Sequence, residues 1–397
     1  MSAEAIKPNR CDKITLTHEI ATLLVLAHDL SDAAIHRRVR MLHMGGAVLT
    51  IAGFRRALQP IPEVEKCPAI NFGRTHNRGF VRRIFAVLTV LVTIRRYQSA
   101  FAAADVVIAR NLEMLAIGVW GRAFADRRPL LVYECLDIHR LMLGRGVVSR
   151  ALRWLEGWLS RSASVLIVSS PAFVDNYFER LSCVRLPIKL IENKVLIGEI
   201  QRPIPRASAP AWIIGWFGIL RCRKSLLMLA ALVKQSQGTV RVVIRGKPAL
   251  DQIPDFHEIV ARTDGLDFGG PYQNPQDLPD LYNKIHFIWA IDMYEEGANS
   301  SWLLPNRLYE GGLFAAVPIA FAHVETGAFL RQRGLGVLIE QPIDDLSLFF
   351  RTLTTDCYHR LFDAMLNEPR ETWVCTHEEC RALVDSLIKM SNENLHV

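Results

Sequence analysis

A glycine and several cations lie where a buried strand is expected to lead into a helix. Residues 216–225 read WFGILRCRKS and place Gly218, Arg221 and Lys224 directly after a predicted strand. Glycine lets the backbone turn closely, and the helix behind it presents free N–H groups and the positive end of its dipole. With Arg and Lys side chains added, this arrangement is typical of a phosphate-binding turn. The alternative is an ordinary strand-to-helix turn with solvated cations.

A second group lies in residues 304–312, LPNRLYEGG. Proline favours the first turn of a helix, so a helix is expected to begin near Pro305. Glu310 then lies about one turn beyond Asn306 and Arg307, on the same side of that helix. A carboxylate at this position could accept hydrogen bonds from both hydroxyls of a ribose. The alternative is a surface Arg–Glu pair, which the spacing alone favours.

The elements that position these groups are short apolar runs alternating with helical patterns. A helix capped by Ser31 or Asp32 is expected to run to Met44. Strands are expected at 23–26, 47–51, 106–109, 130–133, 165–168 and 188–191, and again at 213–217, 240–244, 286–289, 317–320 and 337–339. Apolar runs without polar alternation are typical of parallel strands covered on both faces. The alternation predicts doubly wound α/β sheets.

The alternation of strands and helices is interrupted once, by residues 201–212, which begin QRPIPRASAP and contain three prolines. This composition predicts a linker between a first domain, 1–200, and a second domain, 213–371. Residues 372–397 are expected to form a C-terminal helix, which either packs on its own domain or crosses back to the first. Two such sheets facing each other with the carboxyl ends of their strands would form an interdomain cleft.

Composition and missing motifs exclude several classes of protein. Half of the residues are apolar and 22% are charged, so the chain can form substantial cores. No GxGxxG follows the first strand and no GxxxxGK[ST] occurs, which disfavours a dinucleotide-binding Rossmann enzyme and a P-loop NTPase. No DxD stands at a strand end, and the single cluster, Cys375-Thr-His377-Glu-Glu-Cys380, lacks a second ligand pair. No metal is expected, and no secretory signal is recognised, so a cytoplasmic location is predicted.

The net charge of +7 is unevenly distributed, with +11 in residues 1–200 and −4 in residues 201–397. Such a basic half faces an anionic partner or is simply solvated. Residues 71–96 contain six arginines and no acid, and these bracket the apolar run 84–94. An apolar helix with arginines at its ends suits an anionic membrane surface, and a buried α/β helix is the alternative. No nucleic acid is expected, because the stretch lacks the motifs of nucleic-acid-binding domains.

The order WFGxLRxxKS, then RGKP, then PNRLYEGGLFAAVPIA resembles the nucleotide-sugar-binding domain of GT-B glycosyltransferases. The pattern is similar to glycosyltransferase family 4 and to bacterial exopolysaccharide-assembly enzymes of the succinoglycan type. The segment from Leu26-Ala-His28-Asp29 to Arg40 is similar to the opening of bacterial members. The resemblance implies two Rossmann-like domains facing across a cleft, without a metal.

When the family's donor-site roles are assigned to the matching positions of this chain, the resemblance implies that Gly218, Arg221 and Lys224 hold the donor diphosphate, with Arg245 nearby. It implies that residues 306–308, including Leu308, line the diphosphate or the sugar and that Glu310 binds the ribose. The family also has a first glutamate, separated from this one by seven intervening residues, but Trp302 stands there. The preceding Asp292, Glu295 and Glu296 fall at the wrong spacing. This departure leaves an inverting outcome open.

In the first domain, Asp137 and His139 leave the carboxyl end of a predicted strand within the sequence YECLDIHR. In an extended segment they lie on the same side, because side chains alternate. Either could be the general base that takes the proton of an acceptor hydroxyl in an inverting transfer. In a retaining transfer His139 could contact the donor sugar instead. The alternative is a helix-capping aspartate and a core histidine. His28 and Asp29 are second candidates on the acceptor side.

The sequence therefore predicts a glycosyltransferase on the inner face of the plasma membrane. It would move a hexose from a UDP-linked sugar to a polyprenyl-diphosphate-linked saccharide in surface polysaccharide assembly, without a cofactor. Two alternatives are a sugar-nucleotide epimerase of the same fold and a non-catalytic subunit that binds a nucleotide sugar or lipid.

Overall fold

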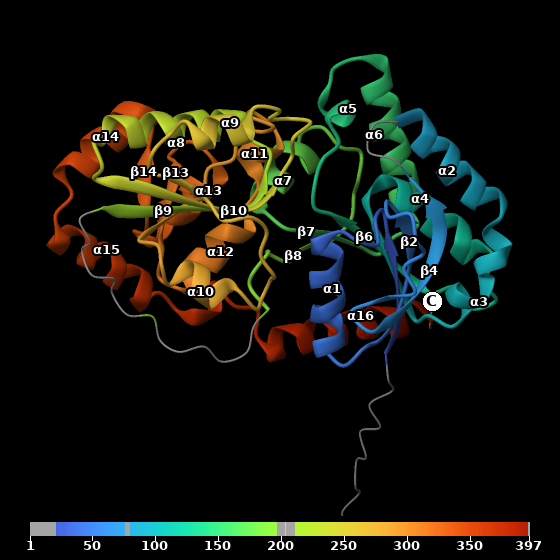
Figure 1. Ribbon diagram of the computed structural model, residues 1–397. Coiled ribbons are helices and arrows are strands. Elements are labelled where there is room, and N and C mark those ends of the chain that lie inside the picture. The colour runs from blue at the N-terminus through green and yellow to red at the C-terminus, as the bar shows by residue number, and fades with distance from the viewer. Residues whose placement is uncertain (1–20, 76–79, 197–202, 204–210, 396–397) are drawn as a thin grey trace, which may run out of the picture.

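The computed structural model describes residues 21–75, 80–196, 203 and 211–395 (Figure 1). Most of the predicted linker 201–212 lies outside these residues, as do positions 76–79 of the arginine-rich segment. Two α/β units stand side by side in Figure 1, each with a central sheet and helices on both faces. We refer to residues up to 196 as the first domain and to residues from 211 to 367 as the second.

The first domain contains an eight-stranded sheet in the order β3-β4-β2-β1-β5-β6-β7-β8. Every neighbouring pair is parallel except β3 and β4. The strands are β1 (Thr22–Ala27), β2 (Val48–Arg55), β3 (Glu63–Val64), β4 (Cys67–Arg74), β5 (Val106–Arg110), β6 (Leu130–Cys135), β7 (Val165–Val168) and β8 (Ile188–Leu190). The six strands expected in this half are present. β3 and β4 were not expected, because β3 has only two residues and β4, next to the sheet edge, is interrupted by Pro68, Asn71 and Gly73 and so has no long apolar run.

Helices cover both faces of this sheet, as the periodic apolar faces of their sequences require. One face is covered by α1 (Ala33–Met44) and by the C-terminal helix. The other is covered mainly by α2 (Phe80–Val92), α3 (Gln98–Ala102), α4 (Asn111–Ala123) and α6 (Val147–Ser160). The short helices α5 (Arg140–Leu143) and α7 (Pro171–Phe173) lie near the domain boundary. Asp32 caps α1, accepting a hydrogen bond of 2.7 Å from the Ala34 N–H.

The second domain contains a six-stranded parallel sheet in the order β11-β10-β9-β12-β13-β14. Its strands are β9 (Trp212–Leu220), β10 (Val240–Pro248), β11 (Leu266–Phe268), β12 (Phe287–Trp289), β13 (Val317–Phe321) and β14 (Val337–Ile339). In Figure 1, α8 (Arg223–Gln235), α9 (Phe256–Ala261) and α14 (Pro342–Thr352) lie above the sheet. Below it lie α10 (Leu278–Tyr282), α12 (Asn306–Leu313) and α15 (Thr355–Asn367). Between β12 and β14 are also α11 (Asn299–Trp302) and α13 (Glu325–Arg333).

Both sheets contain the strand order 3-2-1-4-5-6, in which the connections change direction at the centre. In such sheets ligands bind outside the carboxyl ends of the strands at this switch point. The switch lies between β1 and β5 in the first sheet and between β9 and β12 in the second. The fold therefore brings two ligand-binding edges into one molecule.

The chain crosses between the domains twice, and the two crossing segments run side by side. Val195 and Val374 form a parallel bridge, with hydrogen bonds from the Val195 N–H to the Trp373 carbonyl and from the Cys375 N–H to the Val195 carbonyl. After the crossing, α16 (His377–Leu395) packs against α1, burying Cys380, Leu383 and Leu387 in the core of the first domain. The C-terminal helix thus crosses back, and it begins five residues later than Thr372, the start expected from the sequence.

A buried group of three charges anchors the carboxyl end of β6. Glu134 is fully buried and accepts a bond of 2.6 Å from Arg38 Nε and one of 2.8 Å from Arg110 Nε. Burial alone would raise the pKa of Glu134, but the guanidinium groups of Arg110 and Arg38 outweigh it and lower the pKa to about 2. The strand end that leads into Asp137 is therefore fixed to β5 and α1.

Replacing Glu134 by glutamine is expected to lower the free energy of unfolding by about 3–5 kcal/mol, because two buried guanidinium groups lose their counter-charge. Urea denaturation at pH 7 measures this. Asp267→Asn, at an exposed pair with Arg241, is the control and should change stability by less than about 1 kcal/mol. Since the folded-state pKa of Glu134 lies below its unfolded value, its contribution is present above about pH 4.5 and is lost as the pH falls towards 2. Equal effects of the two substitutions would contradict the assignment.

Among the described residues, no single helix is long and apolar enough to cross a membrane. Arg82–Val92 and Ile94–Ala102 meet the criterion only as a pair, and they are bent by 69° at the break between them.

Candidate active site

A cleft of about 680 Å³ lies between the carboxyl ends of the two sheets. The first domain lines it with the start of α1 and with residues 193–196, and the second domain lines it with the loops after β9, β10 and β12 and with the start of α12. Five of the predicted donor-site residues line this cleft, namely Gly218, Arg221, Asn306, Arg307 and Glu310. The fold thus brings together two motifs that are almost 90 residues apart in the chain.

The glycine of the first motif lies inside a strand and not in a turn. β9 continues to Leu220, and α8 begins at Arg223. Gly218 has φ +113° and pairs with Gly246 of β10, whose φ is +139°. A Cβ on Gly246 would lie 1.8 Å from the Gly218 carbonyl oxygen. Only glycine permits this conformation and this approach of the two backbones, which leaves open space beside the end of β9.

Glu310 is held at the cleft wall by two side-chain hydrogen bonds. Its carboxylate is 6% exposed and accepts hydrogen bonds of 2.7 Å from Asn274 Nδ2 and from the Tyr282 hydroxyl. Burial raises the pKa of Glu310, although both hydrogen bonds oppose that shift. Two neutral donors therefore fix the orientation of the carboxylate at the cleft wall, where it can accept further hydrogen bonds from a ligand.

The cations of the second domain differ in what they contact. Arg307 donates to the Ile291 carbonyl at 2.7 Å, while its buried Nε has no partner among the described residues. Arg245 donates to the Gly270 and Pro271 carbonyls, which holds the loop before Asn274. Lys224 lies exposed in the first turn of α8 and pairs with Glu296. Leu308 is fully buried in the core beneath α12, so its side chain does not face the cleft.

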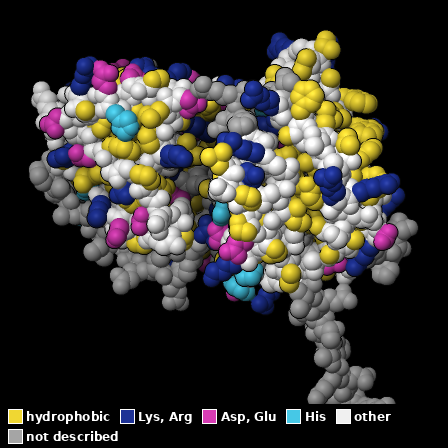
Figure 2. Space-filling model, turned by 45° about the vertical axis from the view of Figure 1, so that its right-hand side comes forward, with side chains coloured by type: hydrophobic (Ala, Val, Ile, Leu, Met, Phe, Trp, Pro, Cys, Tyr) yellow, Lys and Arg dark blue, Asp and Glu magenta, His cyan; other side chains and the backbone are white. Residues whose placement is uncertain are grey.

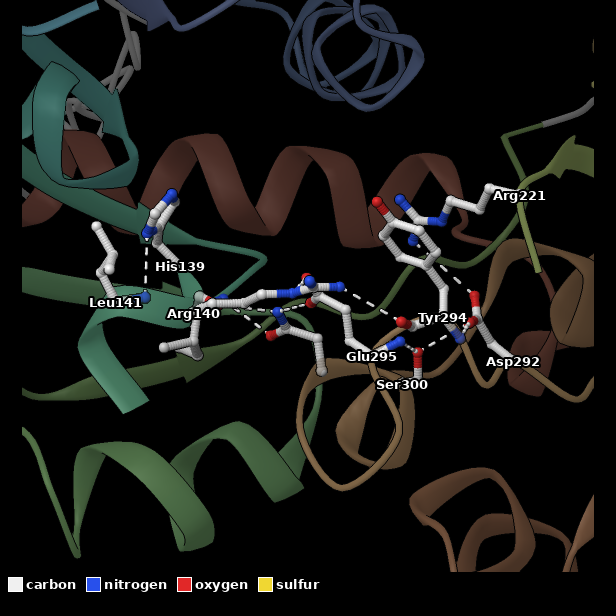
Figure 3. Close-up of polar contacts among 10 residues, drawn as sticks. His139, Arg140, Leu141, Arg221, Asp292, Tyr294, Glu295 and Ser300 are labelled. Carbon is white, nitrogen blue, oxygen red and sulfur yellow. Dashed lines mark hydrogen bonds and ion pairs between the residues drawn. The ribbon is translucent and has the colours of Figure 1, made fainter. Parts of the chain in front are cut away.

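Arg221 is held in the cleft by an aromatic ring that both domains share. Its guanidinium lies 4.5 Å from the centre of the Tyr294 ring and 3.9 Å from the Asp292 carboxylate (Figure 3). Arg140 of the first domain lies 5.3 Å from the same ring and donates to Glu295 at 2.6 Å. The loop after β12 therefore contacts the first domain directly, and Arg221 lies beside that contact.

Asp137 lies on the first-domain side of this contact, two residues beyond the end of β6. Its side chain is exposed to solvent, and within the described part of the chain its carboxylate accepts no hydrogen bond. The surrounding protein nevertheless displaces much of its hydration and raises its pKa to about 6. The positive charge of Arg221 opposes this shift, and the negative charges of Asp32 and Glu295 add to it. A carboxylate with these properties is suited to take a proton near neutral pH.

The other first-domain candidates are engaged in local contacts. His139 caps α5, with Nδ1 accepting a bond of 3.3 Å from the Leu141 N–H (Figure 3). His28 lies 3.1 Å from Asp32, and its buried Nδ1 has no partner among the described residues. Asp29 is buried, accepts hydrogen bonds from Ser31 and pairs with Arg56 at 2.8 Å. The helix-capping role considered for the 137–139 pair thus belongs to His139 and not to Asp137.

Asn299 of the second domain holds the backbone between Asp137 and His139. Its Oδ1 accepts a hydrogen bond of 2.9 Å from the Ile138 N–H, and its Nδ2 donates one of 2.8 Å to the Ile138 carbonyl. Asn299 is 5% exposed, so both bonds are shielded from water. One amide side chain therefore satisfies both backbone groups of Ile138 and sets the position of Asp137 relative to the second domain.

The chain is 42% identical over 379 residues to the succinoglycan biosynthesis protein ExoL of Rhizobium meliloti, and this alignment covers 93% of the chain and 94% of ExoL. The chain belongs to the ExoL family. No protein-family model matches it.

Among solved structures it is similar to HepE of Anabaena in complex with UDP and glucose, with a TM-score of 0.61, 16% identity and coverage of 94% of this chain and 98% of HepE. It is also similar to sucrose-phosphate synthase of Thermosynechococcus elongatus, with a TM-score of 0.67, 12% identity and coverage of 95% and 98%. The fold is that of the GT-B glycosyltransferases, as the sequence motifs predicted.

In this ExoL-family chain, Trp302 stands where the family 4 pattern would place its first glutamate, and this tryptophan joins the two domains. Trp302 packs against the first-domain core, with its ring 6.4 Å from that of Phe173 in an edge-on arrangement. Its carbonyl accepts a bond of 2.5 Å from the Ser170 hydroxyl. Among the described residues, no three His, Cys, Asp or Glu side chains gather in a way that could hold a metal ion.

Sequence reasoning missed several residues of the ExoL-family site. Asn274 stands in a loop and Asn299 begins the short helix α11. Neither belongs to a motif, and no local signal distinguishes them from other asparagines. Tyr272 and Lys247 line the cleft. Lys247 follows the predicted strand 240–244, so its position beyond a strand end could have indicated it, whereas Tyr272 follows β11, which was not predicted. Arg37 also lines the cleft and donates to the Lys194 carbonyl at 2.6 Å, which only the tertiary structure shows.

Proposed function

We propose that this protein transfers a hexose from a UDP-linked sugar to a lipid-linked saccharide during exopolysaccharide assembly. It would act as a peripheral protein on the inner face of the plasma membrane, with residues 71–96 towards the anionic leaflet. Membership of the ExoL family supports the exopolysaccharide assignment. The similarity to HepE, which was solved with UDP and glucose, supports a UDP-sugar donor.

The donor would bind along the second-domain wall of the cleft. Glu310, oriented by Asn274 and Tyr282, would accept hydrogen bonds from the ribose hydroxyls. The unpartnered Nε of Arg307 and the accessible guanidinium of Arg221 would contact the diphosphate. The N-terminus of α12, with its free N–H groups, adds positive potential at the same place. These groups stabilise the charge that develops on the departing UDP.

Asp137 would act as the general base from the first domain. It takes the proton of the acceptor hydroxyl while that oxygen bonds to the anomeric carbon, and the bond from this carbon to UDP breaks with its electron pair remaining on UDP. A single displacement of this kind inverts the anomeric centre. Asp137 is favoured over His139 because the Nδ1 of His139 already accepts a bond from Leu141.

The observation that carries the proposal is the position of Asp137 in the first domain, close enough to Arg221 for that charge to act on its pKa, while Arg221, Arg307 and the oriented Glu310 line the cleft from the second domain. A base and a diphosphate site on facing domains are what a transfer between two substrates requires. A binding subunit would need the second-domain wall alone.

Calorimetric titration with UDP, GDP and ADP, with and without Mg²⁺, tests the donor site. We expect UDP to bind in both conditions, and Glu310→Ala to weaken this binding at least tenfold because two hydrogen bonds to a charged acceptor are lost. Glu258→Ala, an exposed carboxylate on α9, is the matched control and should leave binding unchanged. If none of the three nucleotides binds, or if both variants bind UDP like the wild type, the donor assignment is wrong.

A further inference from the structure

A second hollow, of about 390 Å³, lies in the first domain beneath α2. Aliphatic side chains from three helices form its walls, among them Val87 and Leu91 of α2, Leu112 of α4, and Leu152, Leu155 and Leu159 of α6. Its volume falls within the range of about 300–1,000 Å³ that is usual for small-molecule sites. Walls of this kind offer a ligand contact with hydrocarbon and few hydrogen bonds.

The inner end of this pocket is polar and belongs to the proposed reaction site. Asp137 and His139 line it. The positive charge of Arg221, in the second domain, lies close enough to Asp137 to act on the pKa of its carboxyl group. Asn111 lines it too, with φ +69° and a buried Oδ1 that has no partner among the described residues. A non-glycine residue in this conformation is strained, and such strain is found preferentially at functional sites. The pocket therefore ends where a ligand hydroxyl would find acceptors.

The outer face of the same helices exposes large apolar side chains. On α2, Phe85 is 65% exposed and Val92 is 85% exposed, and on α6 Trp154 is 63% exposed. Figure 2 shows hydrophobic side chains gathered on the first domain with Lys and Arg among them. Exposed tryptophan and aliphatic groups beside arginines are typical of a surface that enters the interfacial region of a membrane. Leu88 of α2 is 48% exposed and also lines the pocket, so the apolar face and the pocket are continuous.

We propose that the pocket binds a hydrocarbon segment of the lipid that carries the acceptor saccharide. The chain enters from the apolar face of α2 and α6, and the head group extends towards Asp137. The assignment rests on the proposed function, since it identifies the pocket as part of the acceptor site. An amphiphile is required because the pocket joins aliphatic walls to a polar end.

Prenyl diphosphates of increasing length test this assignment, because each buried methylene strengthens binding. Isothermal titration of the full chain with geranyl, farnesyl and geranylgeranyl diphosphate is expected to show at least a fivefold gain from geranyl to farnesyl. Ala116→Phe, which fills the pocket from α4, should weaken the binding of farnesyl diphosphate at least tenfold. It should also remove the dependence of affinity on prenyl chain length. Ala123→Phe, at the exposed end of the same helix, is the matched control and should bind like the wild type.

Leu88→Gln is a second variant. Because Leu88 is half exposed, its replacement does not disturb the core of the fold, and it should weaken the binding of farnesyl diphosphate at least threefold. Binding that is independent of chain length, or equal in Ala116→Phe and Ala123→Phe, would overturn the proposal. Equal displacement of farnesyl diphosphate by phosphatidylglycerol vesicles would also overturn it, because the pocket would then hold any membrane lipid. UDP titration of the same samples separates the two failures: loss of UDP binding concerns the proposed function, and loss of prenyl binding alone concerns this pocket.

Discussion

Asp137→Asn is expected to lower kcat by about 10²–10⁴-fold, the range that general bases contribute. Asparagine keeps the shape of the side chain but cannot accept the proton of the acceptor hydroxyl. Binding of UDP should remain within about twofold of the wild type, because Asp137 belongs to the first domain and does not line the donor cleft. Initial rates of transfer from the UDP-sugar, combined with UDP titration, measure both quantities.

The pH dependence of the wild type follows from the same carboxyl. Its pKa is raised to about 6 by loss of hydration, and the reaction requires the ionised form, so kcat/KM should fall as the pH falls through about 6. Because the folded-state pKa lies above the unfolded value, the carboxylate destabilises the fold at pH 7, and Asp137→Asn should preserve or raise the melting temperature. His139→Gln is the comparison: a larger loss of kcat in this variant than in Asp137→Asn would reassign the base. Full transfer by Asp137→Asn would favour a non-catalytic subunit.

Asn299→Ala is expected to lower kcat by about 10–100-fold while leaving UDP binding unchanged, because a displacement of about 1 Å at a reacting group costs about this much. The substitution removes both hydrogen bonds to Ile138, and Asp137 then loses its fixed position. Asn299→Asp keeps an acceptor for the Ile138 N–H but places a carboxylate against the Ile138 carbonyl, so it should not restore the rate.

Arg140→Ala separates positioning of Asp137 from general contact between the domains. Arg140 joins the domains through Glu295 and the Tyr294 ring, without contacting the Ile138 backbone. Its loss should lower kcat less than the loss of Asn299 does. Equal losses in the two variants would indicate that any weakening of the interdomain contact has the same effect, and the role assigned to Asn299 would be wrong.

The fold could be predicted from the sequence because local patterns report burial. Uninterrupted apolar runs such as those at 23–26 and 106–109 form central strands, since both faces of a parallel sheet are covered. β4 lies next to the sheet edge and is interrupted by Pro68, Asn71 and Gly73, so the same criterion missed it. The order of motifs also sufficed to predict the GT-B architecture.

The candidate site could be predicted only where a motif fixed the geometry within one element. Glu310 faces the cleft and Leu308 the core although they are two residues apart, because two residues span about 200° of a helix. Helical spacing could have separated these two side chains, whereas the motif alone treated Leu308 as part of the lining.

Most of the residues that are buried in strands and helices can be recognised from the sequence, because burial leaves a local periodic pattern. Which distant groups meet becomes visible in the folded molecule alone. Asn299 and Ile138 are 161 positions apart, α16 crosses to the first domain, and Trp302 joins the domains at the position of the absent glutamate. Such contacts depend on how two separately folded sheets face each other, and a local pattern of apolar residues records that a side chain is covered but not which partner covers it.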